Sequence, residues 1–521
     1  SFTLNLRKNT VFGMSVLYIG YSYVKPEVSP LPKHNQEQIN QLKKYLGSAT
    51  SYEQWKDIAQ SLDHLEQREA WKDDIQSDIY NYDVLLDRFK SLQADRLAGN
   101  TEDLARALRE GLHHDLGNMG NIRLYQESYF GTKKLIEQYV EEVCLCIEYL
   151  CDNLVVSMTS SQKLDFFKTV LLSFGRPALL MSGGASLGAF HLGVAKSLWE
   201  NDLLPQVITG SSAGSIIASV LGTRTDEEIP ELFDPEAHSL HPWRWKGLFS
   251  GLSGRGFMDQ RQLQRVIREY LGEYTMEEAY ERSGRSINVT VSPVQHHQKE
   301  RLLSGITTPY LLLWSAVLAS CAVPAIFPPV KLQKKDKHGD TAPYMPRLRW
   351  VDGSVVSDLP VERLMHLYDV NYSIVSQTNP HVVPFLKDKA GSQKTSFAEI
   401  PMAWLKAELK FRSKGLSDYV RKNANSQILR QSAGQLHAMM SQTYYGDVTI
   451  APNYKLRHYM KVLSNPSSEF IQELMLEGER STWPKMSMIA THSRISKTLE
   501  KSIAKLKNDV RSHRAKLSII A

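Results

Sequence analysis

Residues 207–222 carry the sequence VITGSSAGSIIASVLG, and this stretch decides the fold. An apolar run that is typical of a buried strand ends at Gly210, and a helical pattern occupies 211–222. The turn between them, Gly210-Ser211-Ser212-Ala213-Gly214, has the form G-x-S-x-G. In that context the pattern predicts a serine on a sharp bend, with small flanking residues because a strained backbone leaves no room for side chains. Ser212 is therefore a candidate nucleophile.

The same order of elements occurs just upstream. The run PALLMS at 177–182 predicts a buried strand, GGASLGAF follows at 183–190, and a helical pattern covers 190–201. Backbone N–H groups of such a turn can bind phosphate or an oxyanion. The glycine spacing is not G-x-G-x-x-G, and no Gly-Lys-Ser/Thr follows, so a nucleotide site is disfavoured. We expect this turn to form an oxyanion hole that faces Ser212.

Repeated strand–turn–helix units predict an α/β fold with a mainly parallel central sheet. Further strands are expected in SINVTVSPV at 286–294 and YSIVSQTNP at 372–380. Residues 30–170 have mostly helical patterns, and basic amphipathic helices are expected at 401–425 and 485–516. The sequence therefore predicts helical regions on both sides of the α/β unit.

Asp352 is the candidate partner of the serine. It ends an apolar run in VDGSVVSDLP at 351–360, and a serine hydroxyl needs a proton acceptor. In the order serine, acid, histidine, the base would be His366 or His381. A direct Ser–Asp dyad is the competing arrangement, and the residue pattern leaves both open.

Composition and charge are ordinary for a folded protein. The chain has 521 residues, 42% of them hydrophobic and 23% charged, with a net charge of +6. These values exclude a mostly disordered chain, a collagen-like repeat and a polytopic membrane protein. We found no nucleic-acid recognition motif. The four cysteines form no C-x-x-C pair, so we predict no zinc or redox site and interpret them as reduced thiols in an intracellular protein.

Two uncharged runs are long enough to consider as membrane segments. Residues 9–24 fall below the ~20 residues that a spanning helix needs. We expect this segment to be buried or to lie at a membrane surface. Residues 302–330 contain four prolines, which favour a buried core helix followed by a loop.

Several motifs together resemble the patatin-like phospholipase family. The strongest are SGGASLGAFHLGV at 182–194, GSSAGS at 210–215 and VDGSVVSDLP at 351–360. Beyond these three motifs, the chain is similar to the fungal and plant triacylglycerol lipases of that family, and the resemblance covers most of the chain. The segments that carry this second similarity are REGLHHDLGNMGNIRLY (109–125), GTKKLIEQYVEEV (131–143), LWSAVLASCAVPAIFPPV (313–330), SQTNPHV (376–382) and STWPKMSMIATHSRI (481–495).

The resemblance implies a Ser–Asp dyad with Ser212 as nucleophile and Asp352 as base, without a histidine, a metal or a cofactor. It implies a three-layer α/β/α sandwich, with Gly210 and Gly214 in the nucleophile elbow. The implied oxyanion hole consists of Gly183, Gly184 and Ala185. The chain departs from the family in two places. Ala185 replaces the usual third glycine, and Leu187 replaces a frequent Arg or Lys, which we interpret as mildly favouring a neutral glyceride substrate.

These expectations define a lipolytic serine acyl hydrolase, and the first interpretation is a triacylglycerol lipase that can also transfer acyl groups to glycerides. The alternatives are a phospholipase A or lysophospholipase of the same family and a non-catalytic lipid-surface scaffold. A nucleotide-binding Rossmann protein is a further rival. The expected division is an apolar segment at 1–29, a helical lipase domain at 30–170, a patatin-like catalytic domain at 175–375 and a mainly helical basic region at 376–521.

The expected partner is a lipid substrate, triacylglycerol or phospholipid, at a membrane or lipid-droplet surface, with no nucleic acid. Two basic amphipathic segments are candidates for peripheral docking there. One is PMAWLKAELKFRSK at 401–414. The other is 501–521, where six Lys and Arg residues stand against one acid, Asp509.

Overall fold

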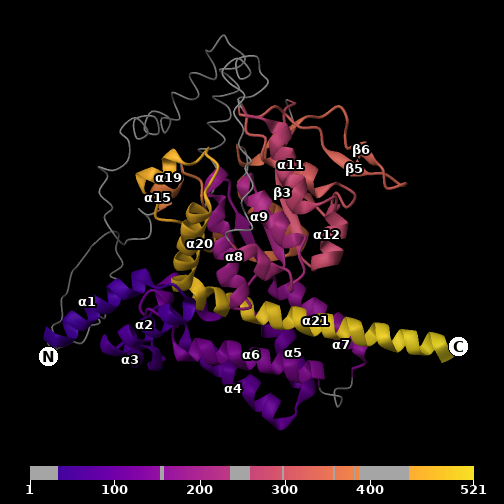
Figure 1. Ribbon diagram of the computed structural model, residues 1–521. Helices are drawn as coiled ribbons and strands as arrows, with labels where there is room; N and C mark the ends of the chain where they lie inside the picture. The colour runs from indigo at the N-terminus through magenta and orange to yellow at the C-terminus, as the bar shows by residue number, and fades with distance from the viewer. Residues whose placement is uncertain are drawn as a thin grey trace, which may run out of the picture.

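A central sheet with helices on both faces stands on a layer of long helices in the computed structural model (Figure 1). The predicted segments 1–29 and 401–414 lie outside the described residues. The structure describes residues 33–152, 158–234, 258–295, 298–324, 326–355, 358–380, 382–386 and 445–520.

Within these ranges, a seven-stranded sheet has the order β4-β3-β2-β1-β8-β9, with β7 paired to β3. The strands β1, β2, β3, β8 and β9 are parallel, whereas β4 and β7 run antiparallel to β3. The predicted mainly parallel sheet is confirmed. The bounds are β1 (Arg176–Met181), β2 (Val207–Gly210), β3 (Ser286–Pro293), β4 (Arg301–Ser304), β7 (Trp350–Asp352), β8 (Val370–Ser376) and β9 (Val448–Ile450), beside a separate hairpin of β5 (Gln333–Lys335) and β6 (Thr341–Pro343).

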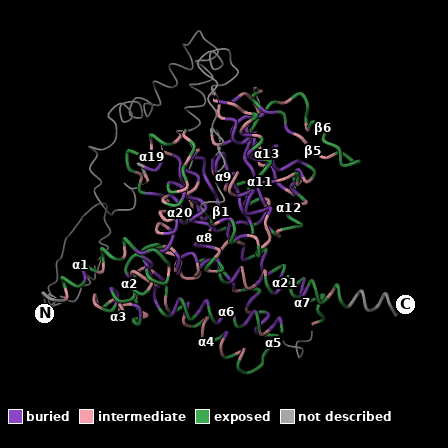
Figure 2. The backbone as a smooth tube through the Cα atoms, viewed as in Figure 1, coloured by how far each residue is buried: buried purple, intermediate pink, exposed green. Residues whose placement is uncertain are grey.

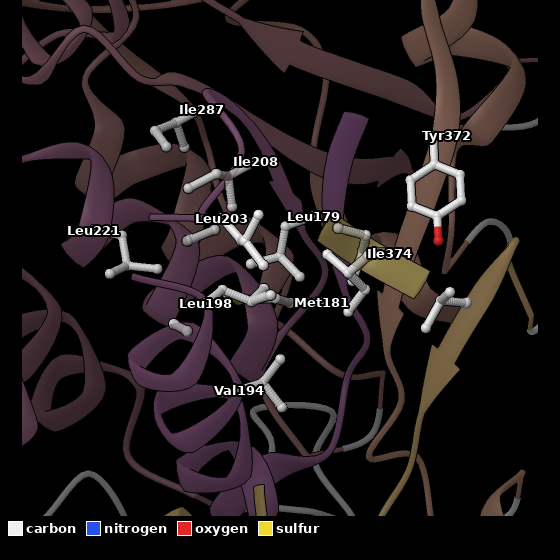
Figure 3. Close-up of a cluster of buried hydrophobic side chains, with 14 of the residues drawn as sticks. Leu179, Met181, Val194, Leu198, Leu203, Ile208, Leu221, Ile287, Tyr372 and Ile374 are labelled. Atoms are coloured by element: carbon white, nitrogen blue, oxygen red, sulfur yellow. The ribbon is translucent and has the colours of Figure 1, made fainter. Parts of the chain in front are cut away.

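Alternating residues of the buried strands divide the core into two layers. On one face, Leu179 and Met181 of β1 pack with apolar side chains of the helices that follow β1 and β2 (Figure 3). On the other face, Leu180 packs with Leu364 and Tyr368. The predicted α/β/α sandwich is therefore confirmed. The helices around the sheet are α8 (Ala189–Glu200), α9 (Ala213–Gly222), α11 (Gln260–Leu271), α12 (Met276–Ser283), α13 (Leu313–Ser320), α14 (Val361–Tyr368), α15 (Val383–Leu386), α19 (Leu456–Met460) and α20 (Ser468–Thr482).

The apolar run at 302–330 is part of this core. It supplies β4 and α13, and every residue of α13 is buried. The expected buried helix is confirmed. No helix within the described ranges combines the length and the apolar character that crossing a bilayer requires.

A helical region precedes the sheet and packs along a long C-terminal helix, α21 (Met486–Ile520) (Figure 1). α21 contacts α6, α7 and β1, so it joins the helical region to the sheet. The helices of this region are α1 (Lys33–Ser48), α2 (Tyr52–Leu65), α3 (Arg68–Asp73), α4 (Tyr82–Ala98), α5 (Thr101–Gly111), α6 (Lys134–Asp152) and α7 (Ser160–Phe174).

Two basic residues of the predicted docking segment 501–521 form ion pairs with acidic residues of the same chain. Lys501 pairs with Asp202 at 2.8 Å, and Lys505 pairs with Asp152 at 2.7 Å. Ile503 and Leu506 on the same helix are buried. The described part of this segment therefore packs on the fold as an amphipathic helix.

The sheet also extends past the expected end of the catalytic domain at residue 375. β9 pairs in parallel with β8, and α20 lies against α8. A boundary at residue 375 would therefore cut β9 off from the central sheet and α20 off from the helix layer that contains α8.

Candidate active site

Ser212 lies between β2 and α9 in a strained conformation. Its φ is 50° and its ψ is −121°, a region that residues other than glycine rarely adopt. Such strain costs ~1–3 kcal/mol and persists only where the surroundings enforce it. The N–H of Ser212 donates to Ser320 Oγ at 3.0 Å, and its carbonyl accepts from Ser215 Oγ at 2.6 Å. The geometry is that of a nucleophile elbow.

Gly210 and Gly214 give the elbow its close packing. A Cβ on Gly210 would lie 2.2 Å from the carbonyl oxygen of Gly214. A Cβ on Gly214 would lie 2.3 Å from the carbonyl oxygen of Met181. Both contacts are with backbone, which cannot move aside as a side chain would. The small residues expected from the sequence are thus required by steric contact.

The pairing of β3 brings Asp352 to this elbow. Val291 pairs with Arg301 of β4 and with Asp352 of β7, so β4 and β7 lie on opposite sides of β3. β2 occupies the side opposite β4 and ends where Gly210 pairs with Val289. β2 and β7 therefore pair with consecutive parts of the same edge of β3. This places Asp352, at the end of β7, close to the turn that follows β2.

The Asp352 carboxyl group is fully buried and only half satisfied. Its Oδ1 accepts from the N–H of Ser354 at 2.8 Å, whereas Oδ2 has no hydrogen-bond partner among the described residues. Burial raises the pKa of Asp352 to about 6, and hydrogen bonding from Ser354 and the nearby Ser212 hydroxyl oppose that rise. The carboxylate is thus mostly ionised at neutral pH and can accept a proton from Ser212.

Histidines lie elsewhere in the described part of the chain. His366 is exposed on α14, and His381 lies outside the described residues. His191 is fully buried, with Nε2 at 3.0 Å from the carbonyl oxygen of Ser182. Burial lowers its pKa to about 4. Within the described ranges, no histidine hydrogen-bonds to Ser212 or Asp352.

The glycine-rich turn after β1, residues 183–188, lies against the elbow, and we call it the oxyanion turn after its expected role. A Cβ on Gly183 would be 3.4 Å from the Cβ of Ser212. The N–H of Gly183 donates to Asp358 Oδ1 at 3.0 Å. The N–H groups of Gly184 and Ala185 have no acceptor among the residues that the structure describes. Of the three expected oxyanion donors, these two are not already used in a hydrogen bond of this kind.

The two departures from the family pattern have different structural settings. Ala185 has a φ of 50°, a conformation that glycine adopts without strain, which gives a physical reason for the usual glycine. Leu187 is fully buried against Phe470 and Leu474. Its side chain is therefore part of the core, and the substrate preference that we drew from Leu187 has no support in this position.

Asp358 is a site residue that the sequence analysis missed. Its carboxyl group bonds to the N–H of Gly183 and to the side-chain amide of Asn379, and its carbonyl accepts from Ser211 Oγ at 2.8 Å. Burial raises its pKa to about 8, and the negative charge of Asp352 adds to the rise. Asp358 thus links the oxyanion turn, the elbow and the end of β8. Asp358 lies in the same VDGSVVSDLP motif as Asp352, and this is the feature of the sequence that could have identified it.

An apolar pocket of about 180 Å³ opens beside Ser212 and Ala185. Its walls come from α9, α11, the chain after α13 and the chain before α20. Representative lining residues are Ile216, Val220, Ile267, Phe327 and Leu463. Such a pocket can hold a hydrocarbon chain next to the serine.

The described residues contain no cluster of His, Cys, Asp and Glu suited to a metal ion. The four cysteines are buried and form no disulfide. The arrangement of serine, carboxylate and free N–H groups can carry out acyl transfer from an ester.

Comparison with known families matches two parts of the chain. Residues 179–365 match the patatin-like phospholipase family, and residues 33–171 match a domain of unknown function, DUF3336. The first match contains the elbow and Asp352, and the second covers the helical region.

Curated relatives extend the match over most of the chain. Triacylglycerol lipase 4 of Saccharomyces cerevisiae is 36% identical over 88% of this chain and 52% of its own length. Triacylglycerol lipase SDP1L of Arabidopsis thaliana is 33% identical over 88% of this chain and 58% of its own length, so the chain spans a little over half of each. Triacylglycerol lipase ptl3 of Schizosaccharomyces pombe is 34% identical over 88% of this chain and 95% of its own length. The resemblance noted in the sequence is thereby confirmed, and the chain belongs to the patatin-like phospholipase family, in the group that includes these fungal and plant lipases.

Proposed function

We propose that the protein is a lipolytic serine acyl hydrolase that releases fatty acids from triacylglycerol. The observation that carries the proposal is the meeting of the strained Ser212 with the buried, half-satisfied carboxyl group of Asp352. The apolar pocket beside Ser212 supports a long-chain acyl substrate. The names of the curated relatives support a neutral glyceride as that substrate.

In the proposed reaction, Asp352 Oδ2 takes the hydroxyl proton while Ser212 Oγ bonds to the ester carbonyl carbon. The N–H groups of Gly184 and Ala185 stabilise the resulting oxyanion, and each such donor contributes ~10²–10³ in turnover. The C–O bond to the glyceride then breaks, and Asp352 returns the proton to the leaving alkoxide. Water deprotonated by Asp352 hydrolyses the acyl-serine, and a glyceride hydroxyl can replace water in a transacylation.

The proposed substrate is insoluble in water, so we also propose that the protein associates peripherally with a membrane or lipid-droplet surface. The proposed domain division keeps a helical domain over 30–170 before the catalytic domain. We extend the catalytic domain to include β9 and α20, because both complete its layers.

The test is a lipid-class turnover panel on the wild type and on Ser212→Ala. Triacylglycerol and phosphatidylcholine are offered in matched emulsions, and released fatty acid is measured. We expect the wild type to prefer triacylglycerol and Ser212→Ala to lose at least ~10⁴ of the turnover. A fluorophosphonate probe should label the wild type at Ser212. A preference for phosphatidylcholine would make the protein a phospholipase A, and an unlabelled, inactive wild type would favour the non-catalytic scaffold.

A further inference from the structure

Three large apolar side chains are exposed close together in sequence on and after α19. Met460 is 74% exposed, Leu456 is 48% exposed and Leu463 is 45% exposed. They belong to residues 455–466, which we call the rim segment. Figure 2 shows α19 at the edge of the molecule, with exposed residues along it. Exposed apolar side chains that gather in one place often mark an interaction site.

The rim segment borders the pocket beside Ser212. Leu463 and Pro466 line that pocket together with Ala185. Ser186, the next residue along the oxyanion turn, donates its N–H to the carbonyl oxygen of Val462 at 3.1 Å and its Oγ to that of Ser464 at 2.7 Å. The exposed surface is therefore continuous with the wall of the pocket and is fixed to the oxyanion turn.

The charge of the rim segment is entirely positive. Its sequence, KLRHYMKVLSNP, contains Lys455, Arg457 and Lys461 and no acid. All three cations are exposed. Arg457 pairs with Glu473 of α20, and Lys461 lies 4.3 Å from the ring centroid of Phe470. Cations beside exposed apolar side chains complement an anionic phospholipid surface.

We propose that the rim segment is the surface by which the protein docks on phospholipid-covered lipid, with Leu456 and Met460 inserted among acyl chains and the flanking cations at anionic head groups. The inference rests on the proposed function, because a water-insoluble ester must reach the pocket from lipid. In this orientation the pocket wall at Leu463 opens toward the lipid, and an acyl chain passes to Ser212 without crossing water.

The test measures flotation of the full 521-residue chain with vesicles of phosphatidylcholine containing phosphatidylserine. All variants carry Ser212→Ala, so binding is scored without turnover. We expect Leu456→Glu/Met460→Glu to weaken vesicle binding by at least about tenfold. The matched control is Leu97→Glu on α4, because Leu97 is 73% exposed and far from the pocket in sequence. It should float like its parent, and thermal melts should show that both variants are folded.

The outcomes separate this inference from the proposed function. Equal flotation of the double variant and its parent overturns the docking surface, even if the active protein hydrolyses triacylglycerol. Weakened flotation supports the surface, even if the active protein hydrolyses no ester. A variant that floats normally but has lost a dimer seen by light scattering assigns the rim segment to a second copy of this chain. For the charge component, we expect Lys455→Glu to weaken binding by about fivefold or more, and unchanged binding overturns that component.

Discussion

The turns that follow β1 and β2 share one unusual backbone angle and are held in place differently. Each contains a residue other than glycine at a φ of 50°, Ala185 in the first turn and Ser212 in the second. The second turn is fixed by its own glycines and by short contacts with neighbouring backbone. The first turn is fixed by side chains from distant parts of the chain, with Asp358 on Gly183 as the main example. The bend that carries the reactive hydroxyl thus depends mainly on close backbone packing, with one added bond from the N–H of Ser212 to Ser320, whereas the first turn depends on side-chain bonds to distant segments.

The largest expected loss of activity comes from changing Asp352, the proposed base beside the second turn. Asp352→Asn removes the proton acceptor and leaves the size of the side chain unchanged. We expect kcat to fall by ~10⁴, as for the loss of a triad residue. The measurement is ester hydrolysis at saturating substrate, with Asp165→Asn on the surface of α7 as a matched control. Turnover close to that of the wild type would return a histidine-based triad to consideration.

A smaller effect tests the remote support of the first turn. In Asp358→Asn, the new amide group faces either the N–H of Gly183 or the amide of Asn379, so one donor loses its acceptor. We expect kcat to fall by about 10² with little change in KM, because a displaced turn weakens oxyanion binding.

Asp358 and Asn379 also allow a rescue experiment. The double variant Asp358→Asn/Asn379→Asp restores complementary partners at both contacts and should recover much of the turnover. If Asp358→Asn lowers KM and kcat together, or if the double variant recovers nothing, Asp358 does not act by positioning the turn.

The pH dependence tests the base that serves the second turn. The pKa of Asp352 is raised to about 6, and the base must be ionised to act. Activity should therefore be level near neutral pH and fall by about tenfold per pH unit below pH ~6. The profile of kcat/KM on a soluble ester measures this without a lipid charge effect. Activity that stays level to pH ~4, the ordinary value for an aspartate, would contradict a buried carboxylate base.

The smallest effect concerns strain in the first turn. Ala185→Gly relieves the positive φ at the cost of some chain entropy, so we expect a gain in the free energy of unfolding of up to ~1 kcal/mol. Ala107→Gly in α5 should instead destabilise by ~1 kcal/mol, because glycine weakens a helix interior. Calorimetric melting of both variants measures the difference. A lower melting temperature for Ala185→Gly would show that the turn is not strained.

The elbow could be predicted from the residue pattern alone, because it is determined by local sterics, whereas the choice of Asp352 as base came from the family resemblance. Gly210, Ser212 and Gly214 lie within five residues, and their mutual contacts follow from the bend itself. The sheet was also predictable, because its buried strands are continuous apolar runs.

The support of the oxyanion turn could not be predicted in this way. Ser186 bonds to Ser464, 278 positions away, and no local pattern encodes that pairing. β9 has only three residues, too few for a period to be recognised.

β9 and α20 come late in the sequence, which has a practical consequence for the design of protein fragments. A fragment cut at the end of the family match, near residue 365, would lack β8 as well as both of these elements. It would expose the edge of β1, which invites intermolecular pairing and aggregation. It would also lose the carbonyl groups of Val462 and Ser464 that anchor Ser186. Expression designs for the catalytic unit alone should therefore retain residues through α20.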